Sequence, residues 1–463
     1  MDILADLRDI LPDGVLSGNE QLIPYLTDAS HFKGDIPLAV VFPSTTKQVS
    51  SLLAYCNNRG IAVVARGGGT SLTGASVLKG KGVVVDMLRM DKIIEVSTVD
   101  KYAACQPGVR LDDLNETLSR HNHFFPPDPG SSIAATVGGV ISTNAGGLRC
   151  LRYGTTKDWI LGVEVVLPGG EVVQFGNRTL KSRIGYDLTS LVVGSEGTLG
   201  IVTGAYLKIA ARPEAVSRIV AFYTGISSLG KAVADIRNGS VQPLVAEFLD
   251  RKTLEAVARG INFDFPPEAR YMLLLDIEGP PEAMDRYMAE VRGTLSKSSP
   301  ILIIETKDEE EMRRLYMARK GAYSSLLKLR RSPGDSVLIG DIVVPPSTLS
   351  EVLEDISETA RKMNIYVALF GHIGDGNIHA NIFVDLNNRE EADRVNSFHR
   401  QLAEIALAHG GSVSAEHGIG IEKRELLQLE YSRRHSEMTI EVMKRIKTVI
   451  DPKGIMNPGK VFF

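Results

Sequence analysis

The sequence predicts a mixed α+β fold with more than one domain, and three patterns carry this prediction. Apolar runs at 38–42 and 61–64 flank a stretch with helical spacing, which indicates a strand–helix–strand unit. Strand-like runs at 162–167 and 171–175 enclose a Pro-Gly-Gly turn, which favours a β-hairpin. Between 214 and 360, strand-like runs alternate with amphipathic helical stretches, which indicates an α+β domain with an antiparallel sheet.

The N-terminal elements follow from local signals. Residues 1–36 form a helical lead-in and an extended approach. Thr45 or Thr46 can cap the first long helix, and Gly60 can end it. Its apolar residues share one helical face, and they are Val49, Leu52, Leu53 and Cys56. Further strands are expected at 82–86 and 93–96.

Size and charge limit the classes of function. A chain of 463 residues has room for two or three domains of roughly 100–200 residues each. Its net charge is −4, from 52 basic and 56 acidic side chains, so it lacks the basic field that binds nucleic acid. We expect no nucleic-acid partner. The oligomeric state stays open, with a homodimer as one alternative.

Cysteine usage and the N-terminus point to a cytosolic protein. Cys56, Cys105 and Cys150 are far apart, and they are too few for a four-cysteine iron–sulfur cluster, so any such centre belongs to a partner. No disulfide framework is indicated. The N-terminus is acidic, and no apolar run reaches the ~18 residues of a membrane span. We expect a cytoplasmic chain, at most peripheral on the inner face of a membrane.

A glycine-rich loop at 65–74 follows the strand at 61–64. Three successive glycines at 67–69 leave the backbone N–H groups open to an anion, and Arg66 adds a fixed charge. Hydroxyl groups follow at Thr70 and Ser71. A strand that leads into such a loop predicts a phosphate cradle, although a plain glycine-rich turn remains the alternative.

Two more glycine-rich segments lie in the same region. Residues 136–147 carry two glycine pairs, a density that disfavours a regular element and suits backbone lying against a large flat ligand. The alternative is close packing of a helix on a strand. The prolines of 126–129 force an extended path before it, and 194–202 forms the third segment. Three such segments are more than a mononucleotide needs.

Histidines and a carboxylate gather in the C-terminal half. Strand-like runs at 366–370 and 378–384 flank a turn with an Asp-Gly pair, so His372 and His379 stand at its entrance and exit and can converge. A helix that ends near Gly410 then leads to Glu416 and His417. Two histidines and one glutamate suit a borderline metal ion with an open coordination position.

Long ordered motifs then resemble a known family. Segments 37–74, 126–147 and 193–200 resemble the FAD domain of the vanillyl-alcohol-oxidase superfamily. Segments 371–379, 415–420 and 451–460 are similar to its branch of FAD-linked D-lactate dehydrogenases and glycolate oxidases. The resemblance implies a bipartite FAD-binding domain of two α+β subdomains, an α+β cap domain with an antiparallel sheet, and a C-terminal tail that returns to the FAD domain. The implied limits are a lead-in at 1–36, the FAD domain at 37–212, the cap at 213–415 and the tail at 416–463.

The resemblance also assigns cofactor residues. It implies noncovalent FAD, because relatives that tether the flavin often place a histidine where this chain has Thr70. The residues implied for the cofactor are Arg66, Gly67, Gly68, Gly69, Thr70, Ser71, Gly74, Pro129, Ser131, Gly138, Gly139, Thr143, Asn144, Gly146, Gly147, Glu196, Gly200, Ile201, Val202 and Asn457.

The implied reaction is oxidation of a D-2-hydroxy acid, with hydride transfer to flavin N5. A divalent ion, zinc or manganese, held by His372, His379 and Glu416 would lower the pKa of the substrate hydroxyl. His417 would remove its proton as general base. Arg319 resembles the family's carboxylate anchor, although a solvated helix arginine is the alternative. Asn381 shares a strand face with His379 and is a further catalytic candidate.

The substrate ranking depends on Ile339. Relatives that take D-2-hydroxyglutarate tend to place a lysine two residues before the aspartate that matches Asp341. Isoleucine cannot pair with a second carboxylate, so we rank D-lactate first, glycolate second and D-2-hydroxyglutarate third. Lys320 or Arg330 could supply a cation from another direction.

Three rival classes remain open at the sequence level. An NAD-dependent Rossmann enzyme needs a G-x-G-x-x-G turn, which the first glycine loop lacks. A metallohydrolase could use the His/Glu set alone, and a transferase like alkylglycerone-phosphate synthase could use the flavin fold without net redox. The electron acceptor also stays open among an electron-transferring flavoprotein, an Fe–S protein partner, a quinone and a cytochrome.

Overall fold

The computed structural model describes residues 2–261, 264–332 and 334–462. By compactness the chain divides into two units. Unit 1 comprises Met1–Gly147, Gly154–Arg212 and Glu416–Phe463, and unit 2 comprises Leu148–Tyr153 and Pro213–Ala415. The domain limits drawn from the sequence stay a prediction. Among the described residues, no helix is both long and apolar enough to cross a membrane.

The first sheet of unit 1 contains the predicted strand–helix–strand unit. Its strands run in the order β1-β2-β4-β3, and β4 pairs in parallel with both β2 and β3. The Thr45 side chain accepts the N–H of Gln48 at the start of α3, and Gly60 ends the helix with φ +64°. Both expected helix ends are therefore confirmed. The elements are α1 (Ile3–Ile10), β1 (Val15–Leu16), α2 (Asn19–Leu22), η1 (Ile23–Tyr25), β2 (Ala39–Val41), α3 (Thr46–Arg59), β3 (Ala62–Arg66) and β4 (Gly82–Asp86).

The second sheet of unit 1 is antiparallel, in the order β5-β6-β10-β8-β9. The predicted hairpin is confirmed, since β8 and β9 pair from Gly162 with Gly176 to Val166 with Val172. The elements are β5 (Ile93–Ser97), β6 (Tyr102–Cys105), α4 (Leu111–Ser119), β7 (His123–Phe124), α5 (Val137–Thr143), η2 (Thr156–Trp159), β8 (Ile160–Val166), β9 (Val172–Gly176), α7 (Leu188–Val192), β10 (Ile201–Lys208) and β11 (Ala210–Ala211).

The first glycine pair of 136–147, Gly138 and Gly139, lies inside helix α5. The expectation that this glycine density disfavours a regular element was wrong for this pair. Thr136 caps the helix by accepting the N–H of Gly139. A Cβ on Gly138 would lie 2.6 Å from Cβ of Pro107, so glycine allows the helix to approach the Pro107 loop closely. Close packing outweighs helix propensity here.

The C-terminal segment returns to the first sheet of unit 1, as the resemblance implied. Val63 in β3 donates its N–H to Ile455 O at 2.8 Å, and Val63 O accepts the N–H of Asn457 at 2.8 Å. Ile455 and Met456 are buried in the core that also holds α3 and the parallel strands. Two helices precede this return, α15 (Arg424–Arg433) and α16 (Met438–Ile450).

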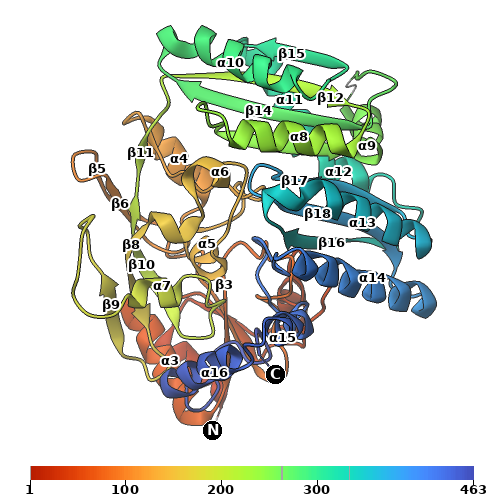
Figure 1. Cartoon of the computed structure of the whole chain (residues 1–463). Coiled ribbons are helices and arrows are strands. Elements are labelled where there is room, and N and C mark those ends of the chain that lie inside the picture. Colours follow the sequence, from red (N-terminus) through yellow and green to blue (C-terminus); the bar gives the residue numbers. More distant parts are fainter. Residues whose placement is uncertain (1, 262–263, 333, 463) are drawn as a thin grey trace. The chain divides into compact units, whose positions relative to one another are not determined.

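Unit 2 is built on an antiparallel sheet, as predicted, with the strand order β15-β12-β14-β13-β17-β18-β16 (Figure 1). The elements are α6 (Cys150–Tyr153), β12 (Ala215–Tyr223), α8 (Ile226–Arg237), β13 (Val245–Asp250), α9 (Arg251–Ile261), β14 (Tyr271–Gly279), η3 (Pro281–Ala283), α10 (Met284–Ser296), β15 (Leu302–Thr306), α11 (Glu309–Lys320), α12 (Ala322–Leu327), β16 (Asp335–Val343), η4 (Pro346–Thr348), α13 (Leu349–Lys362), β17 (Val367–Gly371), β18 (Asn377–Asp385) and α14 (Arg389–Ala408).

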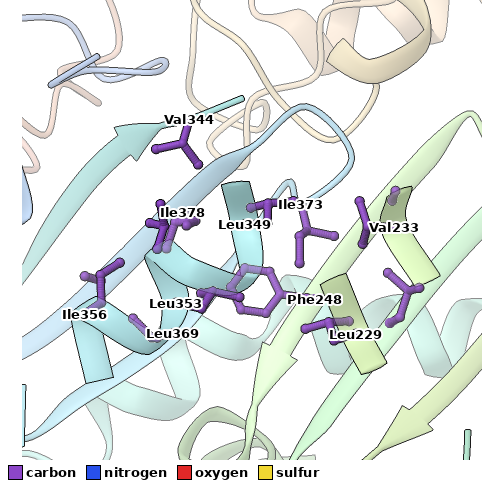
Figure 2. Packing of buried hydrophobic residues seen from close by; sticks show 14 of the residues in the cluster. Leu229, Val233, Phe248, Val344, Leu349, Leu353, Ile356, Leu369, Ile373 and Ile378 are labelled. Atoms are coloured by element: carbon purple, nitrogen blue, oxygen red, sulfur yellow. The ribbon is translucent and has the colours of Figure 1, made fainter. Parts of the chain in front are cut away.

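The two faces of this sheet differ in chemistry. Helices α8, α10, α13 and α14 cover one face with an apolar layer, in which Phe248 of β13 packs near Leu353 and Leu369 (Figure 2). Helices α9, α11 and α12 pack on the other face against residues such as Leu249 and Phe370. Since successive strand residues alternate, Glu247 lies on the second face with Leu249. That second face also carries His379 and Asn381 of β18.

Candidate functional site

In unit 1, two of the glycine-rich segments lie directly against each other. A Cβ on Gly68 would lie 2.0 Å from Ala134 O, and one on Gly67 would lie 2.3 Å from Oγ1 of Thr136. Any side chain at either position would push the two segments apart. The loop after β3 and the residues before α5 therefore pack closely against each other, and these two segments together are called the glycine cradle.

Several predicted cofactor side chains also hold this cradle in shape. Arg66 donates from Nη1 to Thr27 O at 2.8 Å, and its guanidinium lies 5.5 Å from the ring centroid of Tyr25. Ser71 Oγ accepts the N–H groups of Thr73 and Ala75. These bonds fix the turn that the sequence assigned to phosphate, so Arg66 and Ser71 have a structural role within the chain.

The other predicted residues of the cradle lie at helix and strand ends. Thr143 Oγ1 donates to Gly139 O at 3.1 Å, and Asn144 ends α5 with φ +51° while its Oδ1 accepts the N–H of Lys157. Pro129 O accepts the N–H of Ser132, and Ser131 O accepts that of Ala134, so both lie in the turn before α5. Gly200 immediately precedes β10, whose first residues are Ile201 and Val202. The remaining predicted positions are Gly69, Thr70, Gly74, Gly146 and Gly147, all within unit 1.

Glu196 has a role that the sequence did not show. Its buried carboxylate accepts the N–H groups of Ile419 and Gly420, both at 2.7 Å. Burial raises the pKa of this carboxyl, and the two N–H bonds oppose that rise. The side chain therefore anchors the segment after His417.

Asn457 is likewise an internal connector. Its amide nitrogen donates to Ala75 O and to Glu196 O, and its Oδ1 accepts from Nζ of Lys460 at 3.2 Å. Burial lowers the pKa of Lys460 to about 8. The tail thus ties the first glycine loop to the third through one asparagine.

Glu416 and His417 are the first residues of the C-terminal part of unit 1. Both side chains are mostly buried, and Nε2 of His417 lies 3.8 Å from Oε1 of Glu416. The backbone oxygen of His417 accepts from Oγ1 of Thr73 at 3.3 Å. His417 is therefore held between the first glycine loop and the Glu196 anchor.

In unit 2, the predicted convergence of His372 and His379 is confirmed. Their ring centroids are 5.3 Å apart and the rings are nearly perpendicular. His379 lies in β18 opposite Phe370 and Asp341, so these three side chains share one face of the sheet. Asn381, two residues on, lies on the same face.

Glu247, which no sequence pattern had singled out, lies at the centre of this cluster. It is fully buried in β13. Its Oε1 accepts from Nδ1 of His372 at 2.6 Å, and its Oε2 accepts from Nε of Arg319. A lone carboxylate inside the apolar run 244–249 was the signal that could have found it, because a buried charge needs partners.

Arg319 is 7% exposed, which excludes the alternative of a solvated helix arginine. It lies near the end of α11, where its guanidinium carbon is 4.5 Å from the ring centroid of Phe370. Phe370 in turn contacts the His379 ring, with centroids 5.5 Å apart. One phenylalanine therefore separates and orients the arginine and the second histidine.

Asp341 is a second carboxylate beside the histidines. Its Oδ1 lies 3.7 Å from Nδ1 of His379 and accepts from Nδ2 of Asn377 at 2.9 Å. Its Oδ2 accepts the N–H of Ala415 at 3.1 Å. Ala415 directly precedes Glu416 in the chain, so Asp341 fixes the residue from which the chain continues to Glu416.

Asn381 is fully buried, and its amide nitrogen donates to Ala368 O and His379 O. Within the described part of the chain, its Oδ1 has no hydrogen-bond partner. A buried acceptor without a donor costs roughly 1–3 kcal/mol, so this atom fits a ligand that brings its own hydroxyl.

The histidine pair fits a divalent metal ion by the chemistry of its surroundings. Nδ1 of His372 has the Glu247 carboxylate at hydrogen-bonding distance, whereas Oδ1 of Asp341 lies 3.7 Å from Nδ1 of His379, which is longer than a hydrogen bond. Metal-ligating histidines usually donate one ring N–H to such a partner, which directs the other nitrogen to the metal. That these residues bind a metal ion or a cofactor stays a prediction in both units.

Protein-family comparisons cover most of the chain. A model described as FAD binding domain matches residues 37–176, and one described as FAD linked oxidases, C-terminal domain, matches residues 212–461. The chain belongs to the FAD-linked oxidase family. The glycine cradle of unit 1 lies within the first match, and the histidine cluster of unit 2 lies within the second.

Full-length relatives agree with this family. The glycolate oxidase subunit GlcD of Bacillus subtilis is 35% identical over 451 residues, 97% of this chain and 94% of the relative. The probable mitochondrial D-lactate dehydrogenase of Danio rerio is 33% identical over 99% of this chain and 91% of its own length. The D-2-hydroxyglutarate dehydrogenase of Stutzerimonas stutzeri is 30% identical over 99% of this chain and 98% of its own.

Solved structures confirm the fold. p-Cresol methylhydroxylase with substrate bound aligns with a TM-score of 0.81 over 99% of this chain and 96% of its own, at 18% identity. An alkyldihydroxyacetonephosphate synthase aligns with a TM-score of 0.75 over 99% and 85%, at 20% identity. At these identities the likeness shows the fold alone, since one fold hosts several reactions.

Proposed function

We propose that this protein is an FAD-dependent dehydrogenase that oxidises a D-2-hydroxy acid to the 2-oxo acid. The observation that carries the proposal is the buried cluster of Arg319, Glu247, His372 and His379. It combines a carboxylate-binding cation with two imidazoles suited to a metal ion. The names of the relatives, which concern glycolate, D-lactate and D-2-hydroxyglutarate, support the same class of substrate.

The cradle of unit 1 would hold FAD without a covalent link, and His372, His379 and Glu416 would hold zinc or manganese. When bound, FAD supplies a hydride acceptor and the metal ion supplies Lewis acidity. The match of residues 37–176 to an FAD binding domain supports this assignment, and glycine at 67 and 68 lets the loop pack against residues 134–136. Thr70 cannot form the histidyl tether.

The chain's own residues would bind the acid and move its proton. Arg319 would bind the α-carboxylate through its guanidinium. Asn381 Oδ1 would accept from the substrate hydroxyl before reaction. A ring nitrogen of His417 would then take the hydroxyl proton, while the hydrogen on Cα leaves with both electrons of its bond. The products are the 2-oxo acid and two-electron-reduced cofactor.

Ile339 supports a small substrate. It pairs with Asn381 across β16 and β18 and therefore shares the face that carries the cluster. An apolar, half-buried side chain suits the methyl group of lactate and cannot pair with a distal carboxylate. We rank D-lactate first, glycolate second and D-2-hydroxyglutarate third.

Spectroscopy tests the proposal directly. The purified protein should absorb near ~450 nm, and anaerobic D-lactate should bleach this band, as expected for a bound redox-active flavin. L-lactate is the matched control, since the proposal requires discrimination at Cα. An unbleached flavin with every 2-hydroxy acid would favour the transferase, and a colourless active protein would favour the metallohydrolase.

The same sample ranks substrates and acceptors. A tenfold preference for D-2-hydroxyglutarate in kcat/KM would overturn the ranking.

We propose that the reduced flavin passes its electrons to an electron-transferring flavoprotein, an Fe–S protein partner, a quinone or a cytochrome. We also propose that the enzyme is cytoplasmic or peripheral on the inner membrane face. Reoxidation by each acceptor in turn distinguishes the four.

A further inference from the structure

We infer that Glu247 is the positioning residue of the site: one buried carboxylate that orients both the proposed metal ligand His372 and the proposed substrate anchor Arg319. The inference rests on the proposed function in one respect: the proposed function states that His372 binds a metal ion and that Arg319 binds the substrate. No sequence motif points to Glu247, whereas its contacts with both groups do.

The first contact is with His372. A carboxylate accepts hydrogen bonds and has none to donate when ionised. Oε1 of Glu247 lies 2.6 Å from Nδ1 of His372, so Nδ1 carries the hydrogen and donates it. In the neutral ring, Nε2 then carries the lone pair. Glu247 thereby selects the tautomer in which Nε2 is the ligand atom.

The second contact is with Arg319. Oε2 of Glu247 accepts from Nε, and the Phe370 ring lies 4.5 Å from the guanidinium carbon. The fork of the guanidinium is therefore fixed from two sides. In the part of the chain that the structure describes, Glu247 takes Nε, so the Nη groups can bind a carboxylate, and the fixed plane sets the direction from which a substrate's α-carboxylate can approach.

The backbone of Glu247 is itself held firmly. It lies in β13 between β14 and β17, with Phe248 anchored in the apolar layer on the opposite face (Figure 2). The paired strand fixes the backbone position of Glu247, and the bonds to His372 and Arg319 fix its carboxylate. Because the two oxygens serve two different cations or donors, the metal ligand and the substrate anchor keep a fixed separation.

A nearby ion pair offers a matched control. Asp276 in β14 holds Arg218 through two bonds of 2.6 Å, and both side chains are buried in the same sheet. This pair has the same chemistry and similar burial, and it has no histidine partner among the described residues. Asp276→Asn therefore reports what loss of a buried Arg–carboxylate pair does to stability alone.

The test compares Glu247→Gln, Glu247→Asp and Asp276→Asn as flavin-loaded proteins. Glutamine keeps the shape but can accept from only one of the two donors. In Glu247→Gln we expect metal retention against a graded chelator to fall by about 10–100-fold, the usual effect of losing such a partner. We expect the Kd for D-lactate, from stopped-flow flavin reduction, to rise about tenfold through misorientation.

The control variants decide what kind of role this is. Asp276→Asn should lower the Tm yet leave both constants within about threefold of wild type, because the described side-chain hydrogen bonds of Asp276 and Arg218 go to each other and to Met312 O, and none of them goes to Glu247, His372 or Arg319. Glu247→Asp keeps the charge and should recover part of both losses, and it serves if Glu247→Gln does not fold. Metal retention and Kd both unchanged in Glu247→Gln would overturn the inference, and a change in one alone would overturn the shared role.

A second experiment tests the inference without depending on the proposed function. In metal-free protein with ¹⁵N-labelled histidine, the His372 resonances should show a hydrogen on Nδ1 and none on Nε2, with His372→Gln used for assignment. The opposite tautomer would overturn the inference even in an active enzyme. Wild-type protein that shows this tautomer but binds no metal and is reduced by no 2-hydroxy acid would refute the proposed function and leave the orientation of His372 by Glu247 in place.

Discussion

At the scale of single residues, His417 offers the sharpest test of chemistry. Its backbone is held by Thr73, and the segment that follows is anchored by Glu196, so removal of the imidazole leaves the loop in place. We expect His417→Ala to slow anaerobic flavin reduction by roughly 10²–10⁴, the usual contribution of a general base. Stopped-flow absorbance measures this rate.

The control for this variant is His121→Ala, which changes an exposed histidine outside the site. It should reduce at the wild-type rate. His417→Ala should also retain its flavin and metal, which separates loss of a base from loss of the cofactor. A rate within a few-fold of wild type would assign proton removal to another group.

The histidines of the site could be predicted to converge, whereas the pairing of the carboxylates with those histidines could not be predicted. His372 and His379 flank an Asp-Gly turn, so local strand and turn rules bring them together. Glu247 lies 125 residues before His372, and only the pairing of β13 with β17 makes them neighbours. Asp341 likewise needs the pairing of β16 with β18. A linear pattern carries no information about such register.

At the scale of elements, helix α5 shows packing overriding propensity. Alanine at Gly138 would gain about 1 kcal/mol of helix propensity. Its Cβ, however, would lie 2.6 Å from Cβ of Pro107. We expect Gly138→Ala to lower the Tm and weaken flavin retention, because α5 follows directly on the glycine cradle.

Gly293 in α10 is the matched control, since a Cβ there would meet nothing within 4 Å. Gly293→Ala should raise the Tm through the same propensity gain of about 0.5–1 kcal/mol. Thermal melts of both variants, with flavin release followed by fluorescence, provide the comparison. Equal shifts in the two variants would mean that the Pro107 contact is not the reason for glycine.

The start of α9 predicts a pH dependence of stability. Asp250 is buried, and its Oδ1 accepts the N–H of Thr253 at 2.8 Å. Burial raises the pKa of Asp250 to about 6 from 3.8. The carboxyl of Asp250 therefore binds its proton more tightly in the folded state than in the unfolded state. Protonated Asp250 contributes its whole stabilisation below about pH 4, and this stabilisation is lost as the pH rises through about 6.

Asp250→Asn removes that dependence while keeping a side chain that can accept at a helix start. We expect the difference in Tm, variant minus wild type, to be more positive at pH 8 than at pH 5. Melts of both proteins across this range measure it. A difference that is constant with pH would show that Asp250 does not titrate there.

At the scale of the whole molecule, the chain leaves unit 1 and returns to it. Residues 148–153 belong to unit 2, although both flanking segments belong to unit 1. The tail reaches β3 across nearly 400 residues of sequence, through the backbone bonds of Val63. Hydrophobic periodicity predicted most elements but could not predict this return, which came from the resemblance alone.

This division gives the last prediction, because the proposed flavin cradle lies within unit 1, whereas two of the three proposed metal ligands, His372 and His379, lie in unit 2. Removing the metal ion with a chelator should abolish turnover with D-lactate yet leave the flavin spectrum unchanged. Readdition of zinc or manganese should restore activity, and either ion can serve since imidazole and carboxylate ligands do not choose between them. Acid denaturation of the same sample should then release the flavin into the supernatant, since Thr70 offers no histidyl link. Full activity without metal would refute the metal site, and flavin that stays with the pellet would refute noncovalent binding, so each half of the proposal can fail separately.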